Sequence, residues 1–221
     1  MARKNGLVHV LTGDGNGKTT SAIGIAVRAS SRGMKVAFIQ FLKGGLSSEL
    51  PALEKLGVTV VSGTKHCARQ KEHAAELLEK GHITFCRDCF AINGMDRLLV
   101  TAAFEKAKKM CAGGEYGLVV LDEIFWAMKE KMVGEEDVLA LMRSRAQNCE
   151  LILTGRGATR AIEDASDYVT HVKKGKHPFD RGRNLALRHR LLIFRPRAQN
   201  SFKRCQGNQP ALRVWIWANS F

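Results

Sequence analysis

The sequence predicts an α/β fold, in which helices flank a parallel β-sheet within a single domain. Short apolar runs alternate along the chain with longer segments of helical periodicity. Continuous apolar runs are typical of strands buried on both faces, and strands that alternate with helices favour parallel pairing through right-handed crossovers. A third observation is a glycine-rich turn that directly follows the first apolar run and precedes a helical segment.

The first part of the chain supplies the elements around this turn. The apolar run at 7–12 is expected to be a strand, and residues 18–32 are expected to be a helix that Gly33 can terminate. The further elements expected here are a strand at 35–41, a short helix at 49–56 and a strand at 58–61. Residues at about 62–92 show no clear period and form an insert rich in cysteine and histidine.

The second part of the chain continues the alternation. Apolar residues recur at helical spacing between Met95 and Met110, which predicts one buried face of a helix. The other elements expected are a strand at 117–123 that ends in two acids, a helix at 135–146, a strand at 150–154, a short helix at 159–165 and a strand at 168–172. The sequence therefore predicts one domain at 1–182 and a separate tail at 183–221.

Charge separates the tail from the rest of the chain. The formal net charge is +14, and residues 181–221 contain nine basic and no acidic side chains, which leaves only +5 for the preceding 180 residues. A mildly basic body suits an enzyme that acts on a small anion. The tail interleaves basic and aromatic residues without helical or strand periodicity, as in a disordered arm, a frameshifted end or a segment that binds nucleic acid. Because such tails mostly bind non-specifically, we do not expect a nucleic-acid partner.

The location predicted from the sequence is cytoplasmic. The chain has no run of about 18 apolar residues, so no membrane span is expected. The first residues also lack the apolar stretch and cleavage site of a secretory signal. In that compartment the six cysteines are expected to be thiols or metal ligands rather than disulfides.

The glycine-rich turn, LTGDGNGKTT at 11–20, predicts a P-loop of the RecA-like class. Its end fits the pattern G-x-x-x-x-G-K-[ST], but Thr12 occupies the place of the first glycine. Strand, loop and helix stand in the order that lets loop N–H groups and a helix N-terminus face an anion. The residues expected to contact a nucleotide here are Gly13, Asp14, Gly15, Asn16, Gly17, Lys18, Thr19 and Thr20.

Two acids at the end of a distant apolar strand complete the expected site. We expect Thr19 and Asp122 to hold Mg²⁺ or Mn²⁺, since a P-loop hydroxyl and a strand-end carboxylate share the metal in nucleotide sites. Lys18 is expected to neutralise phosphate oxygens. Glu123 is expected to act as a base or to orient a substrate.

The whole pattern resembles the corrinoid adenosyltransferases of the cobalamin pathway, which use ATP. The matching stretches are TGDGNGKTTSAIGIAVRA (12–29), GMKVAFIQFLKG (33–44), YGLVVLDEIFWAM (116–128), LILTGRGA (151–158) and KHPFDRG (176–182). The resemblance implies transfer of the 5′-deoxyadenosyl group of ATP to Co(I) of a reduced corrinoid, with tripolyphosphate as the leaving group. It also implies a homodimer and a flavin-type reductase as electron donor.

The resemblance implies further contacts with the substrates. Arg28, Gln40 and Lys43 lie on or near segments expected to face the nucleotide or the corrinoid, and Arg156 follows a strand at the edge where α/β proteins bind ligands. The catalytic residues expected are Lys18, Asp122 and Glu123. Their task would be to align the reacting atoms and to stabilise charge on the departing triphosphate.

The insert departs from the family. Its segment KGHITFCRDCFAING at 80–94 stands where the family carries an F-T-W-type aromatic motif. Cys86 and Cys89 form a C-x-x-C pair with Cys67 upstream, and this is how many structural zinc sites begin. Cys111 or a histidine would supply the fourth ligand. Three unligated thiols, a redox pair or an iron–sulfur cluster are alternatives that the spacing leaves open.

Two other functions are compatible with the sequence. A RecA-like P-loop ATPase acting on nucleic acid would bind the nucleic acid through the basic tail. A module that binds ATP or a corrinoid without catalysis would have lost its activity through the altered insert and tail.

Overall fold

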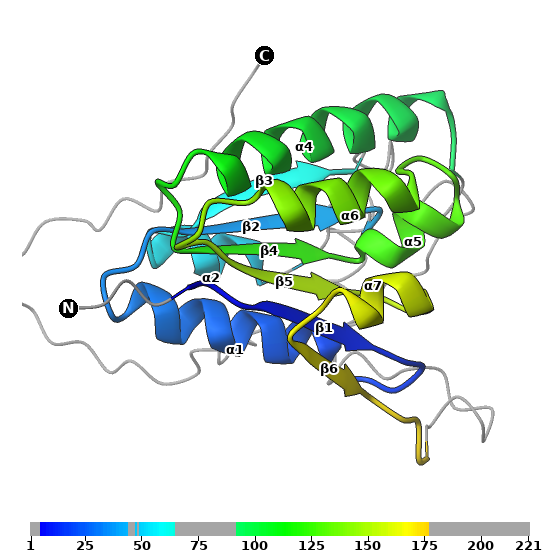
Figure 1. Ribbon diagram of the computed structural model, residues 1–221, viewed down its shortest axis with the longest axis horizontal. Helices are drawn as coiled ribbons and strands as arrows, with labels where there is room; N and C mark the ends of the chain where they lie inside the picture. The colour runs from blue at the N-terminus through cyan, green and yellow to red at the C-terminus, as the bar shows by residue number, and fades with distance from the viewer. Residues whose placement is uncertain (1–4, 44–46, 48, 65–91, 177–221) are drawn as a thin grey trace, which may run out of the picture. The chain divides into compact units, whose positions relative to one another are not determined.

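A computed structural model of the protein describes residues 5–43, 47, 49–64 and 92–176. This part of the chain forms a six-stranded parallel sheet in the order β3-β2-β4-β5-β1-β6, with every strand pointing the same way (Figure 1). The strands are β1 (Val8–Thr12), β2 (Val36–Phe41), β3 (Thr59–Gly63), β4 (Leu118–Asp122), β5 (Glu150–Thr154) and β6 (Tyr168–His171). The predicted α/β class and parallel sheet are confirmed.

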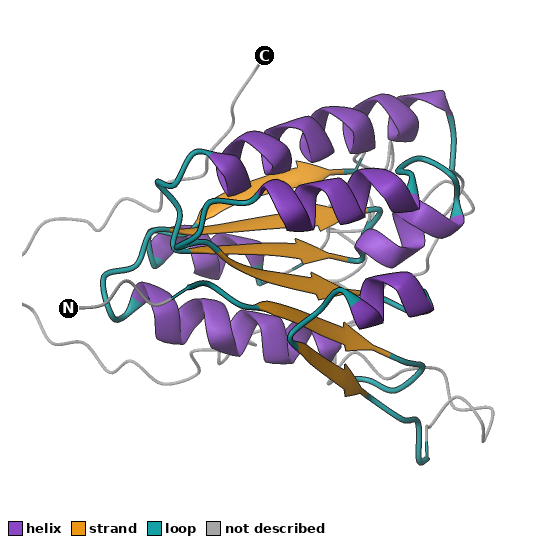
Figure 2. Cartoon of the chain, viewed as in Figure 1, coloured by secondary structure: helices purple, strands orange, loops and turns teal. Residues whose placement is uncertain are grey.

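Helices cover both faces of the sheet (Figure 2). The helices are α1 (Lys18–Ser30), α2 (Leu50–Lys55), α4 (Gly94–Ala112), α5 (Ile124–Lys129), α6 (Glu135–Ser144) and α7 (Arg160–Asp164). Apolar residues of α1 and α2 pack on one face, and those of the other four helices pack on the opposite face. No helix in the described ranges is both long and apolar enough to cross a membrane.

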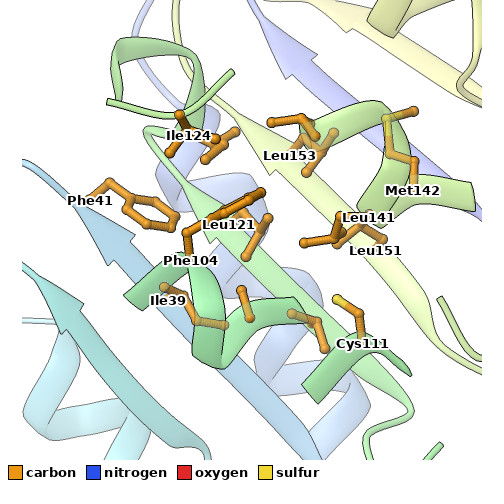
Figure 3. Close-up of a cluster of buried hydrophobic side chains, with 14 of the residues drawn as sticks. Ile39, Phe41, Phe104, Cys111, Leu121, Ile124, Leu141, Met142, Leu151 and Leu153 are labelled. Atoms are coloured by element: carbon orange, nitrogen blue, oxygen red, sulfur yellow. The ribbon is translucent and has the colours of Figure 1, made fainter. Parts of the chain in front are cut away.

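The central strands are buried along their whole length. All residues of β2 and β4 are buried, because side chains that alternate between the faces meet a helix on either side. Phe38 belongs to the core under α1, whereas its neighbour Ile39 belongs to the larger core under α4. Figure 3 shows Ile39 close to Leu121 and Phe104 in that larger core. The two cores hold the carboxyl ends of the central strands in place.

The structure adds one element to those expected from the sequence. Helix α5 begins at Ile124, directly after β4, where only a strand end was predicted. Its six residues are too few to show a helical period, and they continue the apolar run of the strand. Strand β3 extends to Gly63, so Ser62 and Gly63 pair with β2 rather than open the insert.

Several expectations fall on residues outside the described ranges. They are most of the insert, including Cys67, Cys86 and Cys89, and the tail with its boundary at residue 182. Cys111, one of the candidate fourth ligands, lies in the last turn of α4 and is buried in the core. A hydrogen bond with the buried Cys149, together with burial, raises the pKa of the Cys111 thiol.

Candidate functional site

The loops that follow the strands meet at one edge of the sheet. All strands are parallel, so the glycine-rich loop after β1 lies at the same edge as Glu123 after β4 and the 155–158 loop after β5. Strand β1 lies between β5 and β6 in the sheet, which places the glycine-rich loop beside the segments that leave both neighbours. Ligands of open α/β sheets bind at this edge.

The glycine-rich loop has the backbone conformation that its glycines allow. Gly13 and Gly17 have φ angles of 111° and 113°, a region that residues with a Cβ rarely adopt. Gly17 is the N-cap of α1, and Lys18 is its first helical residue. Asn16 and Thr20 are exposed on the loop and on the first turn of the helix. The N-terminal N–H groups of α1 therefore lie at the edge where an anion could bind.

Segment 172–174, which leaves β6, forms an outer wall for this loop. The carbonyl of Val172 accepts a hydrogen bond from the N–H of Gly15, and its N–H donates to the carbonyl of Thr12, both at 2.7 Å. A Cβ on Gly15 would lie 2.7 Å from the carbonyl oxygens of Val172 and Lys173. The backbone of segment 172–174 therefore leaves no room for a side chain at position 15, so this position requires glycine. The loop motif by itself does not predict this close contact.

Asp14 holds the same segment through its side chain. Its Oδ1 accepts a hydrogen bond of 3.1 Å from the N–H of Lys174. This hydrogen bond holds the pKa of Asp14 below its ordinary value. The structure therefore gives Asp14 a role in binding the loop to segment 172–174.

Lys18 is held by the loop that precedes it. Its ammonium donates to the carbonyl oxygens of Gly13 and Gly15, both at 2.7 Å, and only 6% of the residue is exposed. Burial lowers the pKa of Lys18, while the nearby carboxylate of Glu123 acts in the opposite direction. Arg156 belongs to the loop after β5 that a hydrogen bond from Ala158 to Thr12 attaches to the start of the glycine-rich loop, and its charge also lowers this pKa. Two of the predicted cations thus lie in one region.

Asp122 is the centre of a buried hydrogen-bond cluster. Its carboxylate is inaccessible to solvent and accepts four hydrogen bonds. Oδ1 accepts from the hydroxyls of Thr19 at 2.9 Å and Thr154 at 2.6 Å. Oδ2 accepts from the amide of Gln40 at 3.0 Å and the ammonium of Lys43 at 2.8 Å. The structure therefore brings together four residues that the sequence singled out: Thr19, Gln40, Lys43 and Asp122.

Thr154 is a member of this cluster that the sequence analysis missed. Its hydroxyl donates to Asp122 and accepts a 3.1 Å hydrogen bond from the N–H of Glu123. Glu123 has a φ of 63°, which is uncommon for a residue other than glycine. Thr154 thus binds the strained turn between β4 and α5. The signal available in the sequence was a polar residue at the end of a buried strand, immediately before Gly155.

Thr12, at the place of the missing glycine, has a contact of its own. Its hydroxyl oxygen accepts a 3.2 Å hydrogen bond from the N–H of Ala158, and the residue is almost fully buried. The N–H of Gly155 donates to the carbonyl of Leu11 at 3.2 Å. These contacts attach the loop that contains Arg156 to the start of the glycine-rich loop.

One predicted residue lies apart from this cluster. Arg28 is exposed in the last turn of α1, ten residues after Lys18, which corresponds to about 15 Å along the helix axis. Its expected contact with a substrate stays a prediction. Within the described residues, no group of three or more His, Cys, Asp and Glu side chains is placed to hold a metal ion.

The parallel sheet, the glycine-rich loop at the start of α1 and the carboxylate at the end of β4 define a P-loop α/β protein. Residues 4–186 match the family described as ATP:corrinoid adenosyltransferase BtuR/CobO/CobP, and the chain belongs to this family of transferases.

Curated relatives support the same assignment. The corrinoid adenosyltransferase of Escherichia coli K12 is 30% identical over 183 residues, which cover 81% of this chain and 82% of the relative. The corrinoid adenosyltransferase CobA of Salmonella typhimurium is 31% identical over 181 residues, with 81% and 82% covered. The corrinoid adenosyltransferase of Pseudomonas aeruginosa is 31% identical over 179 residues, with 81% and 80% covered.

Proposed function

We propose that the protein transfers the 5′-deoxyadenosyl group of ATP to Co(I) of a corrinoid, releases tripolyphosphate and forms adenosylcobalamin or a related adenosylcorrinoid. The observation that carries the proposal is the hydrogen bond between Thr19, at the start of α1, and the buried Asp122. This bond joins the glycine-rich loop to a carboxylate at the ligand-binding edge of the sheet. Membership of the adenosyltransferase family supports the choice of reaction.

The proposed reaction requires the protein to align the reacting atoms and to stabilise the negative charge of the leaving group. An electron pair of Co(I) forms the Co–C bond to C5′ of the ribose as the C5′–O bond breaks, and the departing oxygen keeps its electron pair on tripolyphosphate. The nucleophile belongs to the substrate, so the protein need not activate water. Holding cobalt, carbon and the leaving oxygen in line lowers the barrier, as does positive charge near the leaving group.

The described residues can supply that positive charge. Lys18 and Arg156 lie at the glycine-rich loop, and the N-terminus of α1 presents N–H groups there. Lys18 at present donates to two loop carbonyls, so a bound phosphate would offer its ammonium charged partners in place of neutral ones. We assign Lys18 and Arg156 to the triphosphate, and Glu123 to positioning of a substrate beside it.

A divalent ion fits the oxygens of Thr19 and Asp122. The Thr19 hydroxyl oxygen and Asp122 Oδ1 are 2.9 Å apart. Two adjacent oxygen ligands of an octahedral Mg²⁺, each about 2.1 Å from the ion, are about 3 Å apart. We propose that these two residues hold Mg²⁺ or Mn²⁺, which when bound supplies positive charge to the phosphates.

Several wider features are part of the proposal. A homodimer and a flavin-type reductase that delivers the electron rest on the resemblance to the family. A cytoplasmic location and a catalytic domain at 1–182 followed by a distinct tail rest on the sequence pattern and charge. Zinc or an iron–sulfur cluster at Cys67, Cys86 and Cys89 stays a prediction that metal analysis of the purified protein can test.

The product assay tests the proposed reaction. The protein is incubated without oxygen in the presence of ATP, Mg²⁺ and chemically reduced cob(I)alamin. We expect tripolyphosphate by ion chromatography and a light-sensitive Co–C bond in the absorption spectrum. Release of ADP and phosphate that DNA stimulates would overturn the proposal, and so would tight corrinoid binding without turnover.

A pair of lysine variants locates the reaction at the glycine-rich loop. We expect Lys18→Ala to abolish product formation, because the triphosphate loses its main charged partner. Lys35→Ala is the matched control, since Lys35 is an exposed lysine before β2, at the opposite edge of the sheet, and pairs with Glu115. Near-normal turnover in Lys18→Ala would remove the loop from the mechanism.

A further inference from the structure

The ammonium of Lys43 contacts both residues assigned to a divalent ion, at the Thr19 hydroxyl oxygen and at the second carboxylate oxygen of Asp122. Its Nζ is 2.5 Å from the Thr19 hydroxyl oxygen and 2.8 Å from Asp122 Oδ2. The carboxylate of Glu123 lies 3.7 Å from the same nitrogen. A cation therefore already contacts the hydroxyl and the carboxylate at this point of the site.

Burial explains why a cation is needed there. Asp122 is fully buried, and its other three hydrogen-bond donors are the neutral groups of Thr19, Gln40 and Thr154. A buried carboxylate without a charged partner is strongly destabilising. Lys43 supplies that partner, whereas the ammonium of Lys18 is turned toward the loop carbonyls.

The cluster also contains an unused acceptor. The side-chain oxygen of Gln40 is buried and has no hydrogen-bond partner among the described residues, although the amide nitrogen of the same side chain donates to Asp122. A buried polar atom of this kind is costly unless a further ligand satisfies it. The arrangement around Asp122 is therefore incomplete with Lys43 alone.

We propose that Lys43 is a resident cation that excludes free divalent ions from the Thr19–Asp122 site, so that the metal enters only together with the phosphates of the nucleotide. An ammonium and a divalent ion cannot both lie within 3 Å of the same carboxylate without strong repulsion. The phosphates bring the negative charge that allows both cations to stay in the site region. The inference rests on the proposed role of Thr19 and Asp122 as metal ligands.

Lys43 is suited to move between two positions. Its side chain is 27% exposed, in contrast to the fully buried carboxylate that it contacts. A lysine ammonium is a point charge on a flexible stem, so it can turn from the carboxylate toward a phosphate or toward solvent without disturbing the packed core. The exchange therefore requires a change of one side chain and no change of the sheet.

Mn²⁺ titration without nucleotide, followed by electron paramagnetic resonance, tests the inference. Lys43→Met keeps the length of the stem and removes the charge. We expect this variant to bind one Mn²⁺ about tenfold more tightly than the wild type, because the competing charge is gone. Lys43→Arg keeps a cation and should resemble the wild type, as should Lys35→Met. Adding Asp122→Asn to Lys43→Met should abolish the gain.

Two results of the Mn²⁺ titration would overturn the inference. Equal Mn²⁺ affinity for wild type and Lys43→Met, whether tight or weak, would overturn the inference, provided that circular dichroism shows both to be folded. When ATP is added, the wild type should gain Mn²⁺ affinity and the difference between the two proteins should shrink; a wild type that does not respond to ATP would also contradict it. The titration uses no corrinoid, so its failure is distinguishable from failure of the product assay.

Discussion

The hydroxyl oxygen of Thr12 accepts a hydrogen bond from the N–H of Ala158, with 3.2 Å between the two atoms. The residue that replaces the first glycine of the loop motif thus joins two loops that follow neighbouring strands, β1 and β5. Glycine has no side chain that could make this contact. The position that departs from the common motif is accordingly a structural contact between the glycine-rich loop and the loop that contains Arg156.

Thr12→Val is expected to lower the free energy of unfolding by about 1–3 kcal/mol, because the N–H of Ala158 loses its partner in a largely buried place. Thr12→Ser retains the hydroxyl and is the matched control. Urea unfolding of the two variants measures the difference. Equal stability of the valine and serine variants would show that this hydrogen bond contributes nothing.

Gly15→Ala is expected to destabilise the protein by about 1–3 kcal/mol, because the new methyl group would overlap the backbone carbonyls of Val172 and Lys173. Gly24→Ala is the control, since a Cβ at that position in α1 meets no atom within 4 Å. Replacing a helical glycine by alanine should stabilise by about 0.5–1 kcal/mol. Thermal unfolding should shift in opposite directions for the two variants, and a shift in the same direction would contradict the account of Gly15.

Thr154→Val should cost about 1–3 kcal/mol, because the N–H of Glu123 and the carboxylate of Asp122 each lose a hydrogen-bond partner. Thr154→Ser keeps both hydrogen bonds and should lose much less. The Mn²⁺ affinity of the same two variants can be compared in the presence of ATP, and we expect Mn²⁺ to bind more weakly only to Thr154→Val. If Thr154→Ser lowers the Mn²⁺ affinity as much as Thr154→Val does, Thr154 does not act through its hydroxyl.

The lowered pKa of Lys18 predicts a pH dependence of nucleotide binding. The ammonium form binds phosphate, and burial makes that form lose its proton at a lower pH than an ordinary lysine does. ATP affinity should therefore fall on the alkaline side before pH reaches the usual lysine range. Lys18→Arg keeps its charge and should show a flatter profile above neutral pH.

The same group affects stability with a definite sign. In the window between its folded pKa and the ordinary lysine value, the unfolded chain holds a proton that the folded chain has lost. The contribution of Lys18 to the free energy of unfolding thus rises with pH in that window. Denaturant unfolding at several alkaline pH values, compared with Lys18→Met, checks this sign; a contribution that falls with pH would contradict it.

Much of the fold could be predicted because its signals are local. The continuous apolar runs at 35–41 and 117–123 became β2 and β4, and the loop with G-K-T became the start of α1. Helix α5 was missed because six apolar residues after a strand carry no period of their own. The family assignment also followed from local motifs, and the family match over residues 4–186 confirmed it.

The sequence by itself determined most of the elements, with α5 the exception, and which residue types stand at strand ends: Lys18 and Thr19 after β1, Asp122 at the end of β4. Only the tertiary structure decided their partners. The order β5-β1-β6 places Thr12 beside Ala158 and Gly15 beside Val172, and the order β2-β4-β5 places Lys43 and Thr154 on Asp122. Hydrophobic periodicity shows whether a strand is buried but is the same for every strand order, so these contacts emerge only when the sheet is assembled.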